Sequence, residues 1–478
     1  MAYSIYDAQS ASRIWNRDKN DEALSAMHIT IIHPAIGHIK NERYIRSWQM
    51  EPLPAAAIAG LTPDDVEISF YDDRMEKIPF DSSTDAVAIS VETYTAKRAY
   101  QIASEYRRRN IPVIMGGFHA TLLPDEVEQY ADAVLIGEAE TIWKEVVLDL
   151  KNGRLKQRYK SDERPLLSDI RLDRSIFKGK RYLPIGLVET GRGCRFSCGF
   201  CAIGSYFEST HRTRPIDDII KEIESLKKEK NIFFFVDDNF IGNIKEAKEL
   251  LRALIPLKIR WITQMSIDGA FDDELLSLLN ESGCKGVLIG FESLDEKNLK
   301  LMNKSFNTMH GGYFKALENL RRYNIRIYAT FVFGYDHDTM DSFDEAVDFA
   351  KEHQFYIAAF NHLTPFPGTP LYTQLEAQGR LRFKQWWLDD NYRYNDLPFS
   401  PLTMLPEEVT RQCVAARRKF YSFSSIFKRI FGKANRSDGF MLRNYLPINF
   451  MHRKDVSSRN GYPLGDENWM GELLMVKR

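Results

Sequence analysis

Three of the five cysteines stand within one loop, as Cys194, Cys198 and Cys201, with the spacing C-x3-C-x2-C. Three thiolates can each bind one iron of a [4Fe–4S] cube and leave the fourth iron open. Structural zinc normally takes four protein ligands, and His211 is the plausible fourth ligand nearby, so a zinc site is the alternative. A disulfide is less consistent with this loop, because an odd set of closely spaced thiols fits a reducing compartment better.

The residues around these cysteines are as distinctive as their spacing. Gly191 and Gly193 precede the first cysteine, and Phe200 stands directly before the third. The loop resembles the signature of the radical S-adenosylmethionine (SAM) enzymes. The resemblance implies that the three cysteines hold a [4Fe–4S] cluster, that the open iron and Phe200 contact SAM, and that an electron from the cluster cleaves SAM to a 5′-deoxyadenosyl radical.

Short apolar segments alternate with charged, helical segments over residues 181–379, which predicts a partial (β/α)6 barrel. Reactive groups on barrels collect at the carboxyl ends of the strands. The cysteine loop follows the first predicted strand, so it lies at the expected catalytic end. The six predicted strands are 185–189, 232–236, 260–264, 286–290, 326–333 and 358–363.

Polar residues also follow the later strands of this predicted barrel. The family resemblance implies that residues at these strand ends contact SAM, and carboxylates among them suit its ammonium group. Asp237 and Asp238 are equally consistent with helix N-caps, because a helical segment begins near Lys245. The SAM contacts that the resemblance implies are Asp238, Gln264, Glu292, Ser293 and Gly334.

The N-terminal part of the chain shows the same alternation with a shorter period. It predicts an α/β fold with a doubly wound parallel sheet, in which ligands bind outside the carboxyl ends of the strands where the strand order reverses. A helix is expected over 96–109. The predicted strands are 28–33, 66–71, 86–91, 112–115 and 133–136.

Two loops at these strand ends carry glycines, residues 116–121 and 137–138. Paired glycines let the backbone approach a bulky planar ligand, although a single glycine more often ends a strand. As a set, the loops resemble the cobalamin-binding domain that precedes the barrel in one large class of radical SAM enzymes. The cobalamin contacts that the resemblance implies are Gly116, Gly117, His119, Thr121, Gly137 and Glu138.

This sequence lacks the motif that supplies a histidine ligand to cobalt in some cobalamin proteins. Some of them supply a histidine ligand from an Asp-x-His-x-x-Gly motif, and the corresponding loop here reads Pro34-Ala-Ile-Gly-His38-Ile-Lys40, without the aspartate. We therefore expect base-off cobalamin without a protein ligand. A domain that keeps the fold and has lost the cofactor is the alternative.

Composition limits the class of protein. The formal net charge of −1 argues against a nucleic-acid partner, and we find no apolar run long enough to span a membrane. No secretion signal is recognised, so we expect a cytoplasmic protein, with association to a membrane surface left open. We expect four regions: an α/β domain at 1–150, a linker at 151–180, the barrel at 181–379 and a capping, substrate-side region at 380–478.

The last region is rich in aromatic and basic residues. From Arg417 to Lys433 the apolar residues have helical spacing. This segment either packs on the barrel, shapes the substrate pocket, or touches a membrane surface.

These features together predict a [4Fe–4S]- and SAM-dependent enzyme. The resemblance favours a cobalamin-dependent methyltransferase that acts on an unactivated carbon of a small substrate such as a lipid or a tetrapyrrole. A radical SAM cyclase or rearranging enzyme on the same scaffold is the alternative. Such an enzyme needs a one-electron donor of the flavodoxin or ferredoxin type.

Overall fold

The computed structural model describes residues 26–161 and 163–476, which form two units. The first unit contains residues 26–182 together with two later pieces, 385–393 and 462–476. The second contains residues 183–384 and 394–461. Two pieces of the region 380–478 thus belong to the first unit, and the remainder belongs to the second. Each unit is described by itself.

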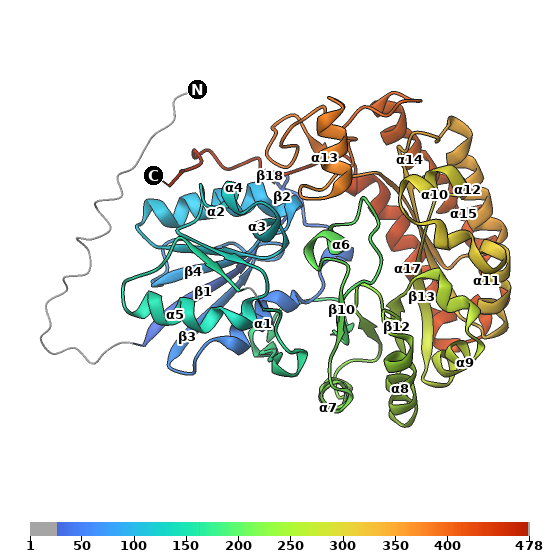
Figure 1. The fold of residues 1–478 in the computed structure, drawn as a ribbon, viewed down its shortest axis with the longest axis horizontal. Helices are drawn as coiled ribbons and strands as arrows, with labels where there is room; N and C mark the ends of the chain where they lie inside the picture. Colours follow the sequence, from blue (N-terminus) through green and yellow to red (C-terminus); the bar gives the residue numbers. More distant parts are fainter. Residues whose placement is uncertain (1–25, 162, 477–478) are drawn as a thin grey trace, which may run out of the picture. The chain divides into compact units, whose positions relative to one another are not determined.

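The first unit is built on a parallel sheet of six strands in the order β3-β1-β4-β5-β6-β7. Helices lie on both faces of the sheet (Figure 1), which confirms the doubly wound fold. The strands are β1 (Met27–His33), β3 (Val66–Asp72), β4 (Ala86–Ser90), β5 (Val113–Gly116), β6 (Ala133–Ile136) and β7 (Arg158–Lys160). The helices are α1 (Leu53–Leu61), α2 (Ala96–Arg108), α3 (Phe118–Leu122), α4 (Pro124–Val127) and α5 (Trp143–Lys151).

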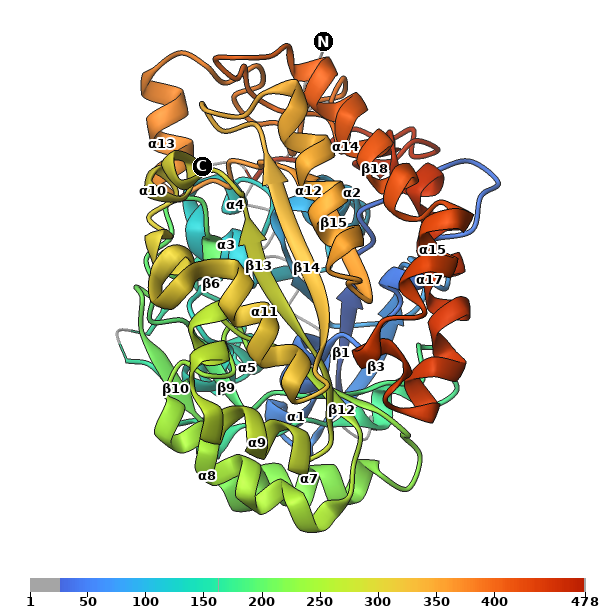
Figure 2. The ribbon, with the colours of Figure 1, turned by 90° about the vertical axis from the view of Figure 1, so that its right-hand side faces the viewer.

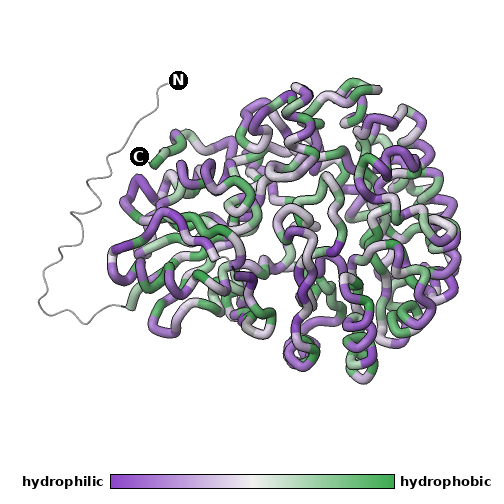
Figure 3. Tube along the Cα trace, viewed as in Figure 1, coloured by the Kyte–Doolittle hydropathy of each residue, from purple (hydrophilic) through white to green (hydrophobic). Residues whose placement is uncertain are grey.

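Hydrophobic side chains explain why this sheet lies inside the unit. Residues 29–32 of β1 and 86–89 of β4 are buried, as expected for a parallel sheet that is covered on both faces. Figure 3 shows them as a hydrophobic band at the place where Figure 1 labels β1 and β4. The strand order reverses between β1 and β4, because the chain moves to one side of β1 for β3 and to the other for β4. In this fold class a ligand binds at that crevice.

The two later pieces of the first unit pack beside the six-stranded sheet, and one of them forms a separate two-stranded sheet. β18 (Gly465–Asp466) pairs in parallel with β2 (Gly37–His38), which follows β1. The backbone N–H of Asp466 donates to Gln101 on α2 at 2.7 Å. Residues 385–393 bring Trp386 and Trp387, both almost fully buried, onto the unit.

The second unit is a parallel sheet of six strands in the order β8-β11-β12-β13-β14-β15. The strands follow each other along the sheet as they do along the chain, which confirms the partial barrel. Figure 2 shows α9, α11 and α12 in front of β13 and β14. The strands are β8 (Gly186–Val188), β11 (Phe233–Phe235), β12 (Trp261–Gln264), β13 (Cys284–Glu292), β14 (Arg326–Phe333) and β15 (Ile357–His362).

The helices of the second unit pack amphipathic faces on this sheet. For example, α8 buries Ala247, Leu250, Leu251 and Leu254, at the spacing of one helix face. A short antiparallel pair, β9 (Gly191–Gly193) and β10 (His211–Thr213), encloses the cysteine loop. The helices are α6 (Ala202–Tyr206), α7 (Ile216–Leu226), α8 (Ile244–Leu254), α9 (Asp273–Glu281), α10 (Glu296–Leu301), α11 (Gly312–Arg322), α12 (Met340–Glu352) and α13 (Pro370–Ala377).

The C-terminal part of the second unit is helical, with α14 (Pro406–Phe420), α15 (Phe423–Arg429), α16 (Lys433–Arg436) and α17 (Gly439–Arg459). The expected helical spacing over 417–433 is interrupted at Ser422, whose side chain caps a new helix by accepting from the N–H of Ser425. Serine is a preferred N-cap residue, which explains the break. Within the described ranges, no helix is both long and apolar enough to cross a membrane.

Candidate functional site

The three cysteines lie in the loop between β9 and α6, at the carboxyl end of β8, and their side chains are half-buried. Burial raises the pKa of each thiol, that of Cys198 to about 11, and Lys304 opposes this shift. N–H groups point at two of the sulfurs: the backbone of Phe196 at Cys194, and the backbone of Ile203 and Gly204 at Cys201. Hydrogen bonds to sulfur are a feature of iron–sulfur ligation, so the loop fits a [4Fe–4S] cluster.

Two segments that follow later strands of the sheet hold this loop in place. The backbone N–H of Gly199 donates to the carbonyl of Met302 at 3.1 Å, and the side chain of Asn303 donates to the carbonyl of Ser197 at 3.0 Å. Gly199 in turn accepts from the N–H of Leu371 on α13 at 2.9 Å. The residues just after α10 and the first turn of α13 therefore both bind the cysteine loop.

His211, the fourth ligand of the zinc alternative, has another role in the structure. It lies on β10, and its ring packs against the backbone of Gly191 and Gly242, where a Cβ atom would collide with it. Burial lowers the pKa of His211. Among the residues that the structure describes, no three His, Cys, Asp or Glu side chains are grouped to hold one metal ion.

Asp237 and Asp238 follow β11 and bind the strand that leads into the cysteine loop. Asp237 accepts from the N–H and hydroxyl of Thr190, at 2.8 and 2.9 Å, and Asp238 accepts from the N–H of Gly193 at 2.8 Å. Burial raises the pKa of Asp237 to about 7 and that of Asp238 to about 6. The N-cap interpretation is wrong for both residues, because Asn243 caps α8.

Two further polar residues extend this arrangement. The side chain of Asn239 donates to the sulfur of Cys194 at 3.7 Å and to the hydroxyl of Ser266 at 3.2 Å. The side chain of Gln264 donates to the carbonyl of Asp237 at 2.5 Å. The ends of β11 and β12 are thus joined next to the first cysteine.

Glu292 and Lys304 form the charged centre of the barrel mouth. Glu292, at the end of β13, is almost fully buried and accepts from the ammonium of Lys304 at 2.7 Å. Burial lowers the pKa of Lys304, but Glu292 and the thiol of Cys198 raise it by more, so the pKa lies above its usual value. Tyr335 follows β14 at the same end of the sheet, and its pKa is raised by burial and then by the nearby Glu292 and Cys198. Phe200 contacts Tyr335 edge-on, with ring centroids 6.5 Å apart.

The other predicted SAM contacts lie at the same strand ends. Glu292 adopts a positive φ of 63°, which bends the chain directly before Ser293. Ser293 is buried and accepts from the N–H of Asp295 at 3.1 Å. Gly334, with φ of 115°, follows β14 and donates its N–H to Asp338 at 2.8 Å. The structure thus gathers the predicted barrel residues at one end of the sheet.

Gly117 brings two strand ends of the first unit close together. It has φ of 101°, and a Cβ there would lie only 2.9 Å from the carbonyl oxygen of Val91, so only glycine fits without strain. Gly116 and Gly137 are less crowded, and a Cβ on Gly137 would meet nothing within 4 Å. The N–H of Gly137 donates to the hydroxyl of Thr121 at 2.9 Å. The open backbone at Gly137 fits the approach of a large flat cofactor.

His119 and Glu138 are held inside the first unit. His119 is fully buried, with one ring nitrogen 3.0 Å from Glu126 and the other 3.3 Å from Thr93. Glu138 is almost fully buried and lies 3.4 Å from Arg164. Because both ring nitrogens of His119 have protein partners, we propose that this residue shapes the edge and is no cobalt ligand.

The histidine of the first loop is also engaged. His38 lies on β2, with Nε2 at 3.1 Å from Asp73, and Asp73 is bound by Arg98 at 2.8 Å. Burial raises the pKa of Asp73, but Arg98 and His38 lower it by more, so the pKa lies below its usual value. His33, at the end of β1, is a residue that the sequence patterns missed. Among the described residues its Nδ1 has no hydrogen-bond partner, and burial lowers its pKa to about 3.

Comparisons with known proteins agree with this geometry. The Radical SAM superfamily matches residues 188–350. The chain is 33% identical over 393 residues to the bacteriochlorophyllide d C-12(1)-methyltransferase of Chlorobaculum tepidum, covering 80% of this chain and 85% of that one. It is 31% identical over 354 residues to the C-8(2)-methyltransferase of the same organism, covering 70% and 78%.

A solved structure has the same fold. The radical SAM methyltransferase TsrM of Kitasatospora setae, with cobalamin and a [4Fe–4S] cluster bound, matches with a TM-score of 0.57 and 18% identity over 81% of each chain. The chain therefore belongs to the radical SAM superfamily, in the methyltransferase family of the two bacteriochlorophyllide relatives. It is a radical SAM enzyme, and its cofactors include a [4Fe–4S] cluster and SAM.

Proposed function

We propose that this protein is a cobalamin-dependent radical SAM methyltransferase that methylates an unactivated carbon at the periphery of a chlorophyll-type tetrapyrrole. The observation that carries the proposal is the similarity to two methyltransferases named for bacteriochlorophyllide d, which extends over most of this chain. The similarity includes the region before the barrel, since it covers 80% of the chain in the first case.

The residues of the barrel mouth have distinct roles in this proposal. Cys194, Cys198 and Cys201 hold the cluster, which supplies the electron that cleaves SAM. Glu292 and Ser293 meet the polar groups of SAM, and the ammonium of Lys304 donates to the buried carboxylate of Glu292 at 2.7 Å. Asp238 holds the end of β9, where the cysteine loop begins, and Gln264 joins the ends of β11 and β12.

The first unit would bind cobalamin at the carboxyl ends of β1, β4, β5 and β6. Gly137 leaves the backbone accessible there, Gly117 lets the loop after β5 pack against Val91, and Thr121 fixes the loop after β6. Bound there, cobalamin would supply the methyl group. His38 is held by Asp73 and His119 by Glu126, so we expect cobalamin to bind base-off.

The reaction also needs a reducing partner. A one-electron donor of the flavodoxin or ferredoxin class would reduce the cluster. We propose such a donor in a reducing compartment, which the free cysteines favour.

The test is an anaerobic incubation of reconstituted protein with bacteriochlorophyllide d, a reductant, cobalamin and SAM deuterated in its methyl group. We expect product that carries the labelled methyl, detected by mass spectrometry, and no product from Cys198→Ala. Cys284→Ala is the matched control, because Cys284 is buried in β13 away from the loop and should keep activity. An altered tetrapyrrole without labelled methyl would replace the proposal by ring-forming chemistry. No reaction with this or any related tetrapyrrole would overturn the substrate class.

A further inference from the structure

Four large aromatic side chains are exposed on the C-terminal helices of the second unit. They are Phe423, Phe427, Phe431 and Phe450, with exposed fractions of 55, 49, 65 and 38%. The first three recur every four residues along α15 and just beyond it, which places them on one face of the helix. We call these four residues the phenylalanine face.

The opposite face of the same helix is well packed. Ile426 is fully buried in a cluster with Tyr356, Met441 and Tyr445. Arg429 is also buried, and its guanidinium donates to the carbonyl of Phe355 at 2.8 Å and lies 3.7 Å from the ring centroid of Phe420. The helix is therefore firmly seated on the unit, and the exposed phenylalanines are not a consequence of loose packing.

The surroundings of the phenylalanine face are strongly basic. Residues 411–460 contain twelve Lys or Arg and two Asp, whereas the whole chain has a formal net charge of −1. Several of the basic residues are exposed, and among them Arg418, Arg453 and Lys454 line a pocket together with Phe423 and Phe450. Positive charge is thus concentrated around one apolar patch.

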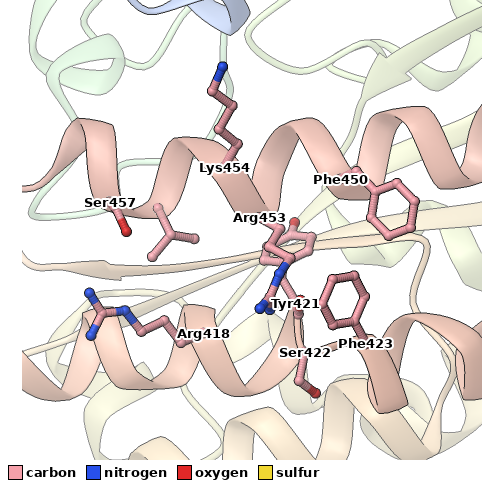
Figure 4. Close-up of a pocket in the computed structure, with 9 residues that line it drawn as sticks. Arg418, Tyr421, Ser422, Phe423, Phe450, Arg453, Lys454 and Ser457 are labelled. Carbon is pink, nitrogen blue, oxygen red and sulfur yellow. Dashed lines mark hydrogen bonds between the residues drawn. The ribbon is translucent and has the colours of Figure 1, made fainter.

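The pocket itself combines an apolar wall with cationic groups. It has a volume of about 730 Å³ and lies between the end of α14, the start of α15 and α17. Figure 4 shows the rings of Phe423 and Phe450 beside each other, 5.9 Å apart between centroids, with Arg453 next to them. The Arg453 guanidinium lies 4.3 Å from the centroid of Phe423 and donates to the carbonyl of Tyr421 at 2.9 Å.

This surface lies away from the cysteine loop within the second unit. Tyr421 bonds to Ala358 at the start of β15, and Arg429 bonds to the residues just before β15. The cysteine loop follows the carboxyl end of β8, which is the opposite edge of the sheet. The phenylalanine face is therefore no part of the barrel mouth, and the contacts described for the SAM site do not use it.

We propose that the phenylalanine face docks this protein on a bilayer surface that contains anionic lipids. Exposed aromatic side chains next to Lys and Arg are the composition of interfacial helices, which insert the rings among the acyl chains and pair the cations with lipid phosphates. The pocket would accept a lipid headgroup, with its phosphate at Arg418 and Arg453. A second copy of the chain on this face would place one basic surface against another, which is unfavourable.

The test is sedimentation of the full chain with vesicles of phosphatidylglycerol and phosphatidylcholine, compared with vesicles of phosphatidylcholine alone. We expect binding to the anionic vesicles that weakens as salt is added, because screening reduces the attraction. The double variant Phe427→Ser/Phe431→Ser should weaken binding on the order of tenfold or more, since it removes two inserted rings. Phe314→Ser is the matched control, because Phe314 is 72% exposed on α11 and outside the face.

Cleavage of SAM to 5′-deoxyadenosine should be the same in all variants, which shows that they fold. Equal binding to neutral vesicles, or unchanged binding of the double variant, would overturn the proposal. So would light scattering that shows a dimer for the parent chain and a monomer for the double variant, because the occupant would then be a second copy. The outcome is independent of the proposed function, which is tested by methyl transfer without vesicles.

Discussion

Glu126 on α4 offers the sharpest test of how the first unit is held together. Its side chain, only 8% exposed, accepts from the hydroxyl of Tyr100 at 2.9 Å and from the indole N–H of Trp387 at 2.9 Å, and it lies 3.0 Å from Nε2 of His119. Gln385 donates to the other oxygen at 2.8 Å. One carboxylate therefore joins α2, α3 and the later piece 385–393.

Replacing Glu126 by Ala leaves three fully buried donors without an acceptor, whereas the exposed Gln385 can turn to water. Each buried unsatisfied group costs about 1–3 kcal/mol. We therefore expect the first unit to lose about 3 kcal/mol or more of its free energy of unfolding, which is a large part of a typical domain's stability.

The assay is urea denaturation followed by tryptophan fluorescence, together with hydrogen exchange of the amides of 385–393, which should exchange faster in Glu126→Ala. Asp125→Ala is the matched control on the same helix. The Asp125 side chain is 86% exposed, and its ion pair with Arg158 is worth at most about 1 kcal/mol. A loss below about 1 kcal/mol for Glu126→Ala, or equal losses for both variants, would refute the reasoning.

Three further predictions concern other parts of the chain. Cys198→Ala should abolish release of 5′-deoxyadenosine and Cys284→Ala should keep it, as chromatography of the products will show. Gly117→Ala should destabilise the first unit by about 1–2 kcal/mol or more in thermal unfolding, because it forces a side chain into a positive φ and against Val91. Burial lowers the pKa of His452 to about 4 in the folded chain. In the unfolded chain its imidazole is protonated below about pH 6.5, so protonation favours the unfolded state as the pH falls. The contribution of His452 to stability should thus be full above that pH and be smaller by about 1 kcal/mol at pH 5.5, so His452→Gln should reduce the acid loss of stability by about that amount and leave the part that belongs to other buried histidines such as His33.

Most strands could be predicted from the sequence because they are short apolar runs between charged segments. The boundaries of β6 and β14 agree with the predicted strands, and those of the other predicted strands differ by one or two residues, whereas β7 lies in the segment expected to be a linker. Parallel strands buried on both faces give such runs, so periodicity located them. The cysteine loop was also recognisable, since its spacing is independent of the tertiary fold.

Contacts between distant segments could not be predicted. The pairing of β18 with β2 joins residues more than four hundred positions apart, and two residues on each strand leave no periodic signal. The same holds for Lys304, a single lysine whose sequence neighbourhood gives no sign that it is buried beside Glu292. A buried charged partner for Glu292 could have been expected, but the sequence does not say which residue supplies it.

The interpretation of Asp237 and Asp238 as N-caps failed for a related reason. Acidic residues before a helix are favoured caps, but here five residues separate Asp237 from Asn243, which is the cap. The two carboxylates instead accept from the backbone N–H groups of Thr190 and Gly193. Only the folded position of the cysteine loop shows that Asp237 and Asp238 bind the strand before that loop and do not cap α8.

The central claim is that this enzyme transfers a methyl group by a radical reaction that uses cobalamin, and the stoichiometry of SAM tests it most directly. In an anaerobic reaction with methyl-deuterated SAM and the tetrapyrrole substrate, we predict about two SAM consumed for each methylated product, as about one S-adenosylhomocysteine and one 5′-deoxyadenosine. The labelled methyl should appear in the product, and hydrogen from the substrate should appear in 5′-deoxyadenosine. Release of 5′-deoxyadenosine with substrate turnover, but without S-adenosylhomocysteine or labelled methyl, would contradict the claim.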